Sequence, residues 1–352
     1  MRIALFLGAG ASVAYGKPTT RDIKNKLQSK YRTNNPPTDA RSILFSFLDN
    51  YHFNDIEDVL QSIYEWDRLR DSHAIKYLSD EKRTAYIQTP SHQVPFPTFL
   101  KQVKEVKEII EDDIFENYSW DRTKNGILLE IMARLIAVVG KSGEAHIFTT
   151  NYDRAVEQFC ILNSAAFKLI DGFGPDSGLG MYTWTNNTYL QQDRENDRKS
   201  VYLYKLHGSL DWKRNSDGII VKTGIERRTN DPNISENIAI MPTISPKDGA
   251  EKEPFKTILQ HFSRFMNEAD VCIVIGYSFR DAHINEVFSS FLSHSGRLIV
   301  VSPNAKADVF GNLYGLQLHE DRIIPNIVPV EQYLTETTIH EIISEISKHL
   351  QK

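Results

Sequence analysis

The sequence predicts an α/β fold, a Rossmann-like doubly wound parallel sheet with a large helical insertion. A short apolar run opens the chain and ends in a glycine-rich turn, and similar runs recur after residue 140, each followed by polar residues. Between them lies a stretch that is helical by its periodicity. We therefore predict a Rossmann-like core over residues 1–30 and 140–352 and a helical insertion subdomain over residues 31–139.

The first run, Ile3–Leu7, is too short to cross a membrane and is typical of a buried parallel strand. Gly8 and Gly10 follow it and have no Cβ, so the chain can bend there and a diphosphate can approach the backbone. Ser12 is suited to cap the next helix, whose bare amide groups would attract an anion. A tight turn without a ligand would use the same residues, so the turn alone favours neither alternative.

The insertion carries two stripes of apolar residues at helical spacing, one beginning at Ile56 and the other at Leu100. A third run, Ile127–Val139, is apolar on nearly every side and is predicted to be buried. The simplest interpretation is a helical subdomain packed on the core, but such an insertion can also self-associate or close over a pocket. An amphipathic closing helix, roughly Glu331–Leu350, is most simply core and could also serve an interface. We expect a homo-oligomer.

Polar residues stand where the next two strands end. Asn151 and Asp153 follow the strand 145–150, and His207 follows the strand 201–206. Ligands of doubly wound sheets bind beyond the carboxyl ends of strands, so these side chains are placed to reach one. From local sequence alone, helix capping is the simpler role for Asn151 or Asp153, and a lone histidine is usually a hydrogen-bonded structural residue.

The last clear strands end in the same manner. The strand 270–275 leads into Gly276–Ser278, and the strand 298–301 leads into Ser302–Asn304. Asp281 is placed to cap the helix that follows, and capping is its expected role. For His283 and Asn285, in the first turn of that helix, we expect packing or capping rather than catalysis.

The long connection 167–201 is rich in Gly, Asp, Asn and Gln, and we expect it to be irregular with one hairpin. Short strands are expected at 219–221 and 238–241. An edge strand is expected at 323–328.

The composition excludes several classes of function. The formal charge of −5 argues against broad adhesion to nucleic acid, so we expect no direct nucleic-acid binding. Cys160 and Cys272 stand among apolar neighbours and are predicted to be buried thiols of a reducing compartment rather than a disulfide or a metal site. No signal peptide precedes the first strand, and no segment is apolar for the length that a bilayer requires. We expect a cytoplasmic protein with no membrane partner.

Taken with its continuation, the opening turn resembles the first motif of the sirtuin family, because Gly8-Ala9-Gly10-Ala11-Ser12 is followed by Gly16, Pro18 and Arg21 without a gap. Three later stretches recur in sirtuin order, namely Thr150–Asp153, Leu206–Gly208, and Gly276–Ser278 followed by Ser302–Asn304. The resemblance implies that NAD is the substrate and that Asn151 and His207 are catalytic. It implies a cofactor-binding role for Gly8, Ala9, Gly10, Ser12, Arg21, Asp153, Gly276, Ser278 and Asn304, with Asp153 open between orienting and capping.

Two departures from the family bear on the reaction. The family's zinc module, which helps to wall the acyl-lysine cleft, needs four cysteines in two close pairs, and this chain has two isolated cysteines. The Pro-Asp-Phe-Arg of deacetylating sirtuins is Pro18-Thr19-Thr20-Arg21 here, and the family phenylalanine shields the reactive sugar from solvent. Thr20 is smaller and polar, so water can approach. Both departures favour hydrolysis of NAD to nicotinamide and ADP-ribose, without a metal, and leave cyclisation of ADP-ribose as a minor alternative.

Sirtuin-like NAD-hydrolysing proteins of bacterial antiphage defence look similar, because they carry a helical block at this point with an acidic stretch like Ile56–Leu60 near its start. That resemblance implies an effector of abortive infection that depletes NAD. It also implies an activating partner, such as a HerA-type ATPase or a short Argonaute, or activation through assembly. Two alternatives remain open, an NAD-dependent protein deacylase and a non-catalytic NAD-binding sensor or assembly scaffold.

Overall fold

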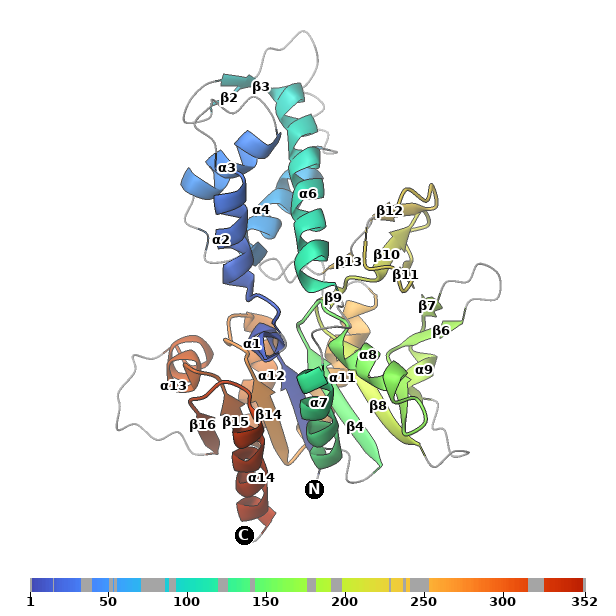
Figure 1. Ribbon diagram of the computed structural model, residues 1–352, viewed down its shortest axis with the longest axis vertical. Coiled ribbons are helices and arrows are strands. Elements are labelled where there is room, and N and C mark those ends of the chain that lie inside the picture. Colours follow the sequence, from blue (N-terminus) through green and yellow to red (C-terminus); the bar gives the residue numbers. More distant parts are fainter. Residues whose placement is uncertain are drawn as a thin grey trace. The chain divides into compact units, whose positions relative to one another are not determined.

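Figure 1 shows the computed structural model of the chain. The structure describes residues 2–14, 16–32, 40–50, 53, 56–70, 86–88, 93–119, 126–139, 143–175, 182–190, 198–227, 229–236, 239–240, 253–315 and 326–350. The chain divides into two compact units. One contains the residues up to Lys17 and most of the chain from Ser119 onward, and the other contains Pro18–Tyr118.

The first unit is built on a parallel sheet of seven strands in the order β16-β15-β14-β1-β4-β8-β5 (Figure 1). The strands are β1 (Ile3–Leu7), β4 (Glu144–Thr149), β5 (Phe167–Ile170), β8 (Lys199–Lys205), β14 (Val271–Ile275), β15 (Arg297–Val301) and β16 (Ile327–Val330). The chain places β4 on one side of β1 and β14 on the other, so the strand order reverses at β1. Doubly wound sheets bind ligands beyond the carboxyl ends of strands at such a reversal. The strand order confirms the predicted fold class.

Helices cover both faces of this sheet. Ile3, Leu5 and Leu7 join one apolar cluster, and Ala4 and Phe6 join a second one on the opposite face. The first cluster includes residues of α7 (Gly126–Val139), α8 (Ala155–Leu162) and α14 (Glu336–Leu350), and the second includes residues of α11 (Phe255–Glu268) and α12 (Ala282–Ser293). Burial on both faces explains why β1 and β14 are continuous apolar runs.

The first unit also contains a smaller antiparallel sheet in the order β12-β10-β11-β7-β6. Its strands are β6 (Phe173–Pro175), β7 (Tyr182–Trp184), β10 (Trp212–Asn215), β11 (Ile220–Lys222) and β12 (Ile234–Glu236). Two residues of β9 (Gly208–Ser209) pair with β13 (Ala239–Ile240). The short helices are α1 (Ala9–Val13), α9 (Asn187–Leu190), α13 (Ala305–Asp308) and the π-helical turn η2 (Val309–Leu313).

The second unit is helical, as the periodicity predicts. It contains α2 (Thr20–Lys30), α3 (Ala40–Asn50), α4 (Ile56–Arg70) and α6 (Phe96–Tyr118), with a hairpin of β2 (Tyr86–Gln88) and β3 (Gln93–Pro95). The predicted stripes supply its buried side chains, among them Ile56, Val59, Leu60, Ile63, Val103, Val106, Ile110 and Ile114. Thr19 and Asp22 form a reciprocal capping box that fixes the start of α2.

The boundaries between the units fall elsewhere than at residues 30 and 140. Helix α2 packs against α3, α4 and α6 and so belongs to the second unit, whereas α7 contacts β1, β4, α8 and α14 and belongs to the first. The buried side chains of α7 explain its position, since Met132, Leu135 and Ile136 join the cluster on the sheet.

Two other expectations were wrong in detail. The connection 167–201 contains the expected hairpin, β6 with β7, but it also contains β5, a strand of the main sheet paired parallel to β8. The closing helix begins at Glu336, and Ile343 on its predicted apolar face is 38% exposed. The edge strand β16 is present at Ile327–Val330, while residues 323–325 lie outside the described residues. No helix within the described ranges is long and apolar enough to cross a bilayer.

Candidate functional site

Three glycines join the turn after β1 to the turn after β14. The N–H of Gly8 donates to the carbonyl of Ile275 at 2.9 Å, and the N–H of Gly10 donates to the carbonyl of Gly276 at 2.8 Å. A Cβ on Gly8 would lie 2.6 Å from the Gly276 oxygen, and one on Gly10 would lie 2.7 Å from the Gly276 Cα. Gly276 has φ +63°, and its Cβ would meet the backbone of Gly10 and Ala11 closer still. These glycines are therefore required for backbone-to-backbone packing.

That packing corrects the expectation of bare amide groups in this turn. The amides of Gly8 and Gly10 donate to the carbonyls of Ile275 and Gly276, and the Ala11 amide donates to the Gly8 carbonyl at 2.9 Å. The missing Cβ atoms of Gly8 and Gly10 make room for the turn after β14 rather than for a ligand.

Ser12 does not cap a helix, contrary to the prediction. It lies inside α1, whose N-cap is Gly8 and has no side-chain capping bond. The Ser12 hydroxyl is buried, donates to Oδ2 of Asp153 at 2.7 Å and accepts from Nδ2 of Asn151 at 3.0 Å. Ser12 therefore connects the turn after β1 to the polar residues after β4.

Asn151 is tied to the same turn through its amide nitrogen. Nδ2 donates to the Gly8 carbonyl at 2.9 Å as well as to Ser12. Its Oδ1 is buried and has no hydrogen-bond partner among the described residues. A buried acceptor without a partner lowers the stability of the folded protein. Oδ1 can therefore accept one hydrogen bond from a ligand or water.

Asp153 uses both carboxylate oxygens within the protein. Oδ1 accepts from the N–H of Ala155 at 3.0 Å, while Oδ2 accepts from Ser12; the N-cap of α8 is Arg154 and carries no side-chain capping bond. The ammonium of the buried Lys205 donates to the Asp153 backbone carbonyl and lies 3.2 Å from Oε1 of Glu157. Asp153 thus holds Ser12 in place.

His207 lies in a second polar group. It is 1% exposed, and its Nε2 is 3.8 Å from Oδ1 of Asp281. Within the described part of the chain, neither ring nitrogen has a hydrogen-bond partner. Burial lowers the pKa of His207 to about 4, against the opposing effect of the Asp281 charge, so the imidazole is neutral at neutral pH.

Asp281 does not cap α12, so the capping prediction was wrong. It occupies the N-cap position without a side-chain capping bond, and its Oδ2 instead accepts from the Tyr277 hydroxyl at 2.7 Å. The ring of His283 is centred 6.1 Å from that of His207, and burial lowers the pKa of His283 too. Both nitrogens of His283 are buried and lack partners among the described residues.

The remaining predicted site residues are more dispersed. Ser278 is half-buried and its carbonyl accepts from Nδ2 of Asn312 at 2.6 Å. Asn304 is exposed at the start of α13, and its N–H donates to the Ser302 hydroxyl at 3.2 Å. Ala9 is the half-buried first residue of α1.

Arg21 is exposed on α2 and belongs to the second unit, as does Thr20, whose side chain lies outside the described residues.

The structure therefore forms two polar groups at the carboxyl edge of the sheet. One consists of Gly8, Ser12, Asn151 and Asp153, and the other of His207, Tyr277, Asp281 and His283. Asn151 and His207 follow the neighbouring strands β4 and β8, in which Thr149 is paired with Lys205. The pairing within the second group was not recognisable from the sequence, since Tyr277 was marked only as part of the Gly276–Ser278 stretch and Asp281 only as a cap.

Cysteine and metal chemistry can be described briefly. Cys160 and Cys272 are both buried and free, and burial raises the pKa of the Cys160 thiol to about 12. In the part of the chain that the structure describes, no group of three His, Cys, Asp or Glu residues could hold a metal ion.

Comparisons with known proteins find one matching family model and several similar solved structures. Residues 145–318 match the protein family described as SIR2-like domain. A search of curated proteins finds no significant match. Among solved structures, a Sir2 homolog–NAD complex is 12% identical with a TM-score of 0.44, covering 99% of this chain and 90% of that one.

A second solved structure, a Sir2–p53 peptide–NAD⁺ complex, is 12% identical with a TM-score of 0.42. The match covers 98% of this chain and 93% of that one. The segment that contains Asn151, His207 and Asp281 is thus similar in sequence to a SIR2-like domain.

Proposed function

We propose that the protein is an NAD glycohydrolase that cleaves NAD to nicotinamide and ADP-ribose. The observation that carries the proposal is the buried neutral imidazole of His207 beside Asp281, within the segment that matches a SIR2-like domain. The imidazole is unprotonated at neutral pH and can accept a proton; burial makes it a weak base, and the Asp281 carboxylate stabilises the imidazolium that forms.

In this proposal NAD binds across the carboxyl edge of the sheet. The diphosphate lies toward the turn of Gly8 and Gly10, and the adenosine lies toward Ser278 and Asn304. Nicotinamide and its ribose lie toward Asn151 and His207. The partnerless Oδ1 of Asn151 supports this orientation, since it offers one hydrogen bond to a ribose hydroxyl or a water.

The chemistry follows from the leaving group. Nicotinamide departs as a neutral molecule from a cationic glycosidic bond, and the sugar passes through an oxocarbenium-like state. Asn151 binds there without adding a charge, which suits a developing positive charge. His207 accepts a proton from the attacking water or from a ribose hydroxyl, a step that typically contributes about two to four powers of ten in rate.

Hydrolysis is preferred to deacylation for a reason in the chain itself. The two cysteines are separate and buried, so they do not supply a zinc module of the kind that walls an acyl-lysine cleft. We further propose that NAD depletion serves bacterial antiphage defence, with a homo-oligomer and an activating partner such as a HerA-type ATPase or a short Argonaute.

The proposal is tested by measuring the reaction products. Purified protein, alone and with candidate partners, is incubated with NAD in the presence and absence of an acetylated lysine peptide, and nicotinamide, ADP-ribose and acetyl-ADP-ribose are quantified. Nicotinamide and ADP-ribose released in equal amounts without peptide support the hydrolase. Release that requires the peptide and yields acetyl-ADP-ribose identifies a deacylase, and NAD binding without any product identifies a sensor.

A further inference from the structure

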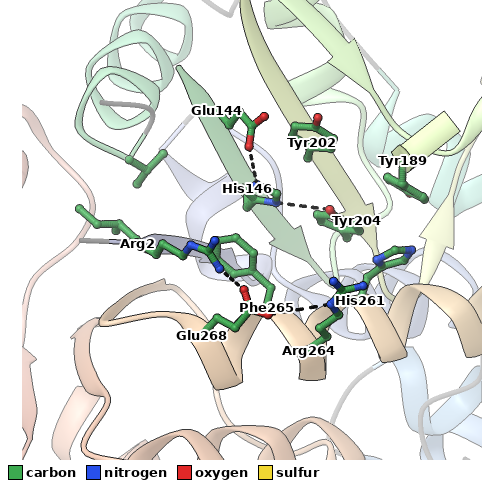
Figure 2. A pocket seen from close by; sticks show the side chains of 12 residues that line it. Arg2, Glu144, His146, Tyr189, Tyr202, Tyr204, His261, Arg264, Phe265 and Glu268 are labelled. Carbon is green, nitrogen blue, oxygen red and sulfur yellow. Dashed lines mark hydrogen bonds and ion pairs between the residues drawn. The ribbon is translucent and has the colours of Figure 1, made fainter. Parts of the chain in front are cut away.

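A cavity, which we call the amino-end cavity, lies at the end of the main sheet opposite to the carboxyl edge, within the first unit (Figure 2). Its volume is about 380 Å³, and its walls come from the start of β1, from β4 and β8, and from α11. The five residues of β1 separate this end from the Gly8 turn by roughly 16 Å at about 3.3 Å per residue. The cavity is therefore separate from the carboxyl-edge site.

Aromatic rings form much of the cavity wall. The His146 ring stacks on Tyr202 at 4.7 Å and on Phe265 at 4.1 Å, and the Tyr204 hydroxyl is 3.3 Å from its Nδ1 (Figure 2). Burial lowers the pKa of His146 to about 4, so at neutral pH its ring is uncharged. The Tyr202 hydroxyl has no hydrogen-bond partner among the described residues. The rings of His146, Tyr202, Tyr204 and Phe265 line the cavity, and Tyr202 and Tyr204 are only 5% and 4% exposed.

Charges are separated across the cavity. Arg2 and Arg264 both pair with the carboxylate of Glu268 (Figure 2), and Oδ2 of Asp270 accepts from the Arg2 backbone N–H at 2.7 Å. The Arg264 side chain is 78% exposed. Glu144 lies at another part of the wall, 46% exposed and 3.8 Å from Nε2 of the neutral His146.

We propose that this cavity binds a nucleoside monophosphate whose base carries an exocyclic amino group. Flat aromatic side chains stack on bases, guanidinium groups form bidentate bonds to phosphate, and a carboxylate accepts from an exocyclic amine. The volume stands at the lower end of the range for ligand pockets, which suits one base with its sugar and phosphate. The site is independent of the proposed NAD chemistry, because its lining contains none of the residues assigned to that reaction.

Calorimetric titration of the full chain with AMP, IMP and adenosine tests the proposal. Arg264→Ala is expected to weaken AMP binding roughly tenfold and to leave adenosine binding unchanged, because only the phosphate contact is removed. Lys256→Ala, an exposed cation on the same helix outside the cavity, is the matched control and leaves both affinities unchanged. Glu144→Ala is expected to abolish the preference for AMP over IMP, since inosine lacks the amino group.

Three results would overturn the proposal. The first is that AMP does not bind at millimolar concentration. The second is an equal affinity for AMP in Arg264→Ala and wild type, and the third is a preference for AMP over IMP that persists in Glu144→Ala. Each readout is binding rather than turnover, so the outcome is the same whether or not the protein hydrolyses NAD.

Discussion

Oδ1 of Asp281 lies 3.8 Å from Nε2 of His207, and the other oxygen of the same carboxylate accepts from the Tyr277 hydroxyl at 2.7 Å. The two residues follow different strands, β8 and β14, which β1 and β4 separate in the sheet. The loops after these strands therefore converge above the carboxyl edge. Tyr277 fixes the carboxylate, and the carboxylate faces the imidazole that we propose as the base.

Asp281→Asn is expected to slow nicotinamide release about tenfold or more, because the imidazolium formed during the reaction loses its opposite charge. Removing that charge also lowers the pKa of His207 further below its present value of about 4. The acid limb of the pH–rate profile should therefore move to lower pH. A merely structural role would lower the rate without moving the limb.

Two companion variants complete this test. Tyr277→Phe keeps the negative charge of Asp281 and should slow nicotinamide release less than Asp281→Asn does. Glu286→Gln, an exposed acid on the same helix, should leave the rate unchanged. An unaltered pH profile in Asp281→Asn would count against the proposed role of Asp281.

Stability is expected to fall as the pH is lowered toward 5. The pKa of buried His207 is about 4 in the folded protein and about 6.5 when unfolded, so the unfolded chain binds more protons between these values. Stability is thus fully present above pH 6.5 and is lost progressively as the pH falls toward 4. Between pH 7 and 5 the loss from His207 is about 2 kcal/mol.

Urea unfolding at pH 7 and pH 5 measures this loss. His207→Asn should reduce the difference between the two free energies of unfolding, whereas replacement of the exposed His340 by Asn should leave it unchanged. An equal pH dependence in wild type and His207→Asn would show that His207 is not a buried neutral histidine.

Gly276→Ala is expected to destabilise the first unit by more than about 3 kcal/mol, because its Cβ would overlap the backbone of Gly10 and Ala11. Gly224→Ala is the matched control: its φ of +69° is similar, but a Cβ there meets nothing within 4 Å, and the expected cost is about 1 kcal/mol. Thermal or urea unfolding compares the two. Equal losses would mean that backbone conformation, and not the contact between turns, requires glycine at position 276.

The sequence predicted the parts of this fold that depend on local pattern. The apolar runs at β1, β4, β8, β14 and β15 were identifiable because both faces of each strand are buried. β5 was missed because three of its four residues are only partly buried and because it lies in a polar connection. Helix α7 was recognised as buried, but its placement against the main sheet depends on tertiary contacts that periodicity does not report.

The candidate site was predictable only in outline. Asn151 and His207 stand at strand ends that the sequence marks. The pairing of His207 with Asp281 joins residues 74 positions apart and could not be read from either neighbourhood. Similarly, Gly8 and Gly10 were identified correctly as special positions, but the reason lies in Gly276, a partner far along the chain. The amino-end cavity is lined by single residues from several helices and strands, so these residues form no sequence motif.

The central claim is that NAD is hydrolysed beside Asn151 and His207. Its most direct measurement is the rate of peptide-independent nicotinamide release by wild type, Asn151→Ala, His207→Ala and the control His340→Ala, each tested alone and with candidate activating partners. The account predicts release by wild type and His340→Ala and a loss of at least about a hundredfold in the other two. Undiminished release by Asn151→Ala and His207→Ala would contradict it.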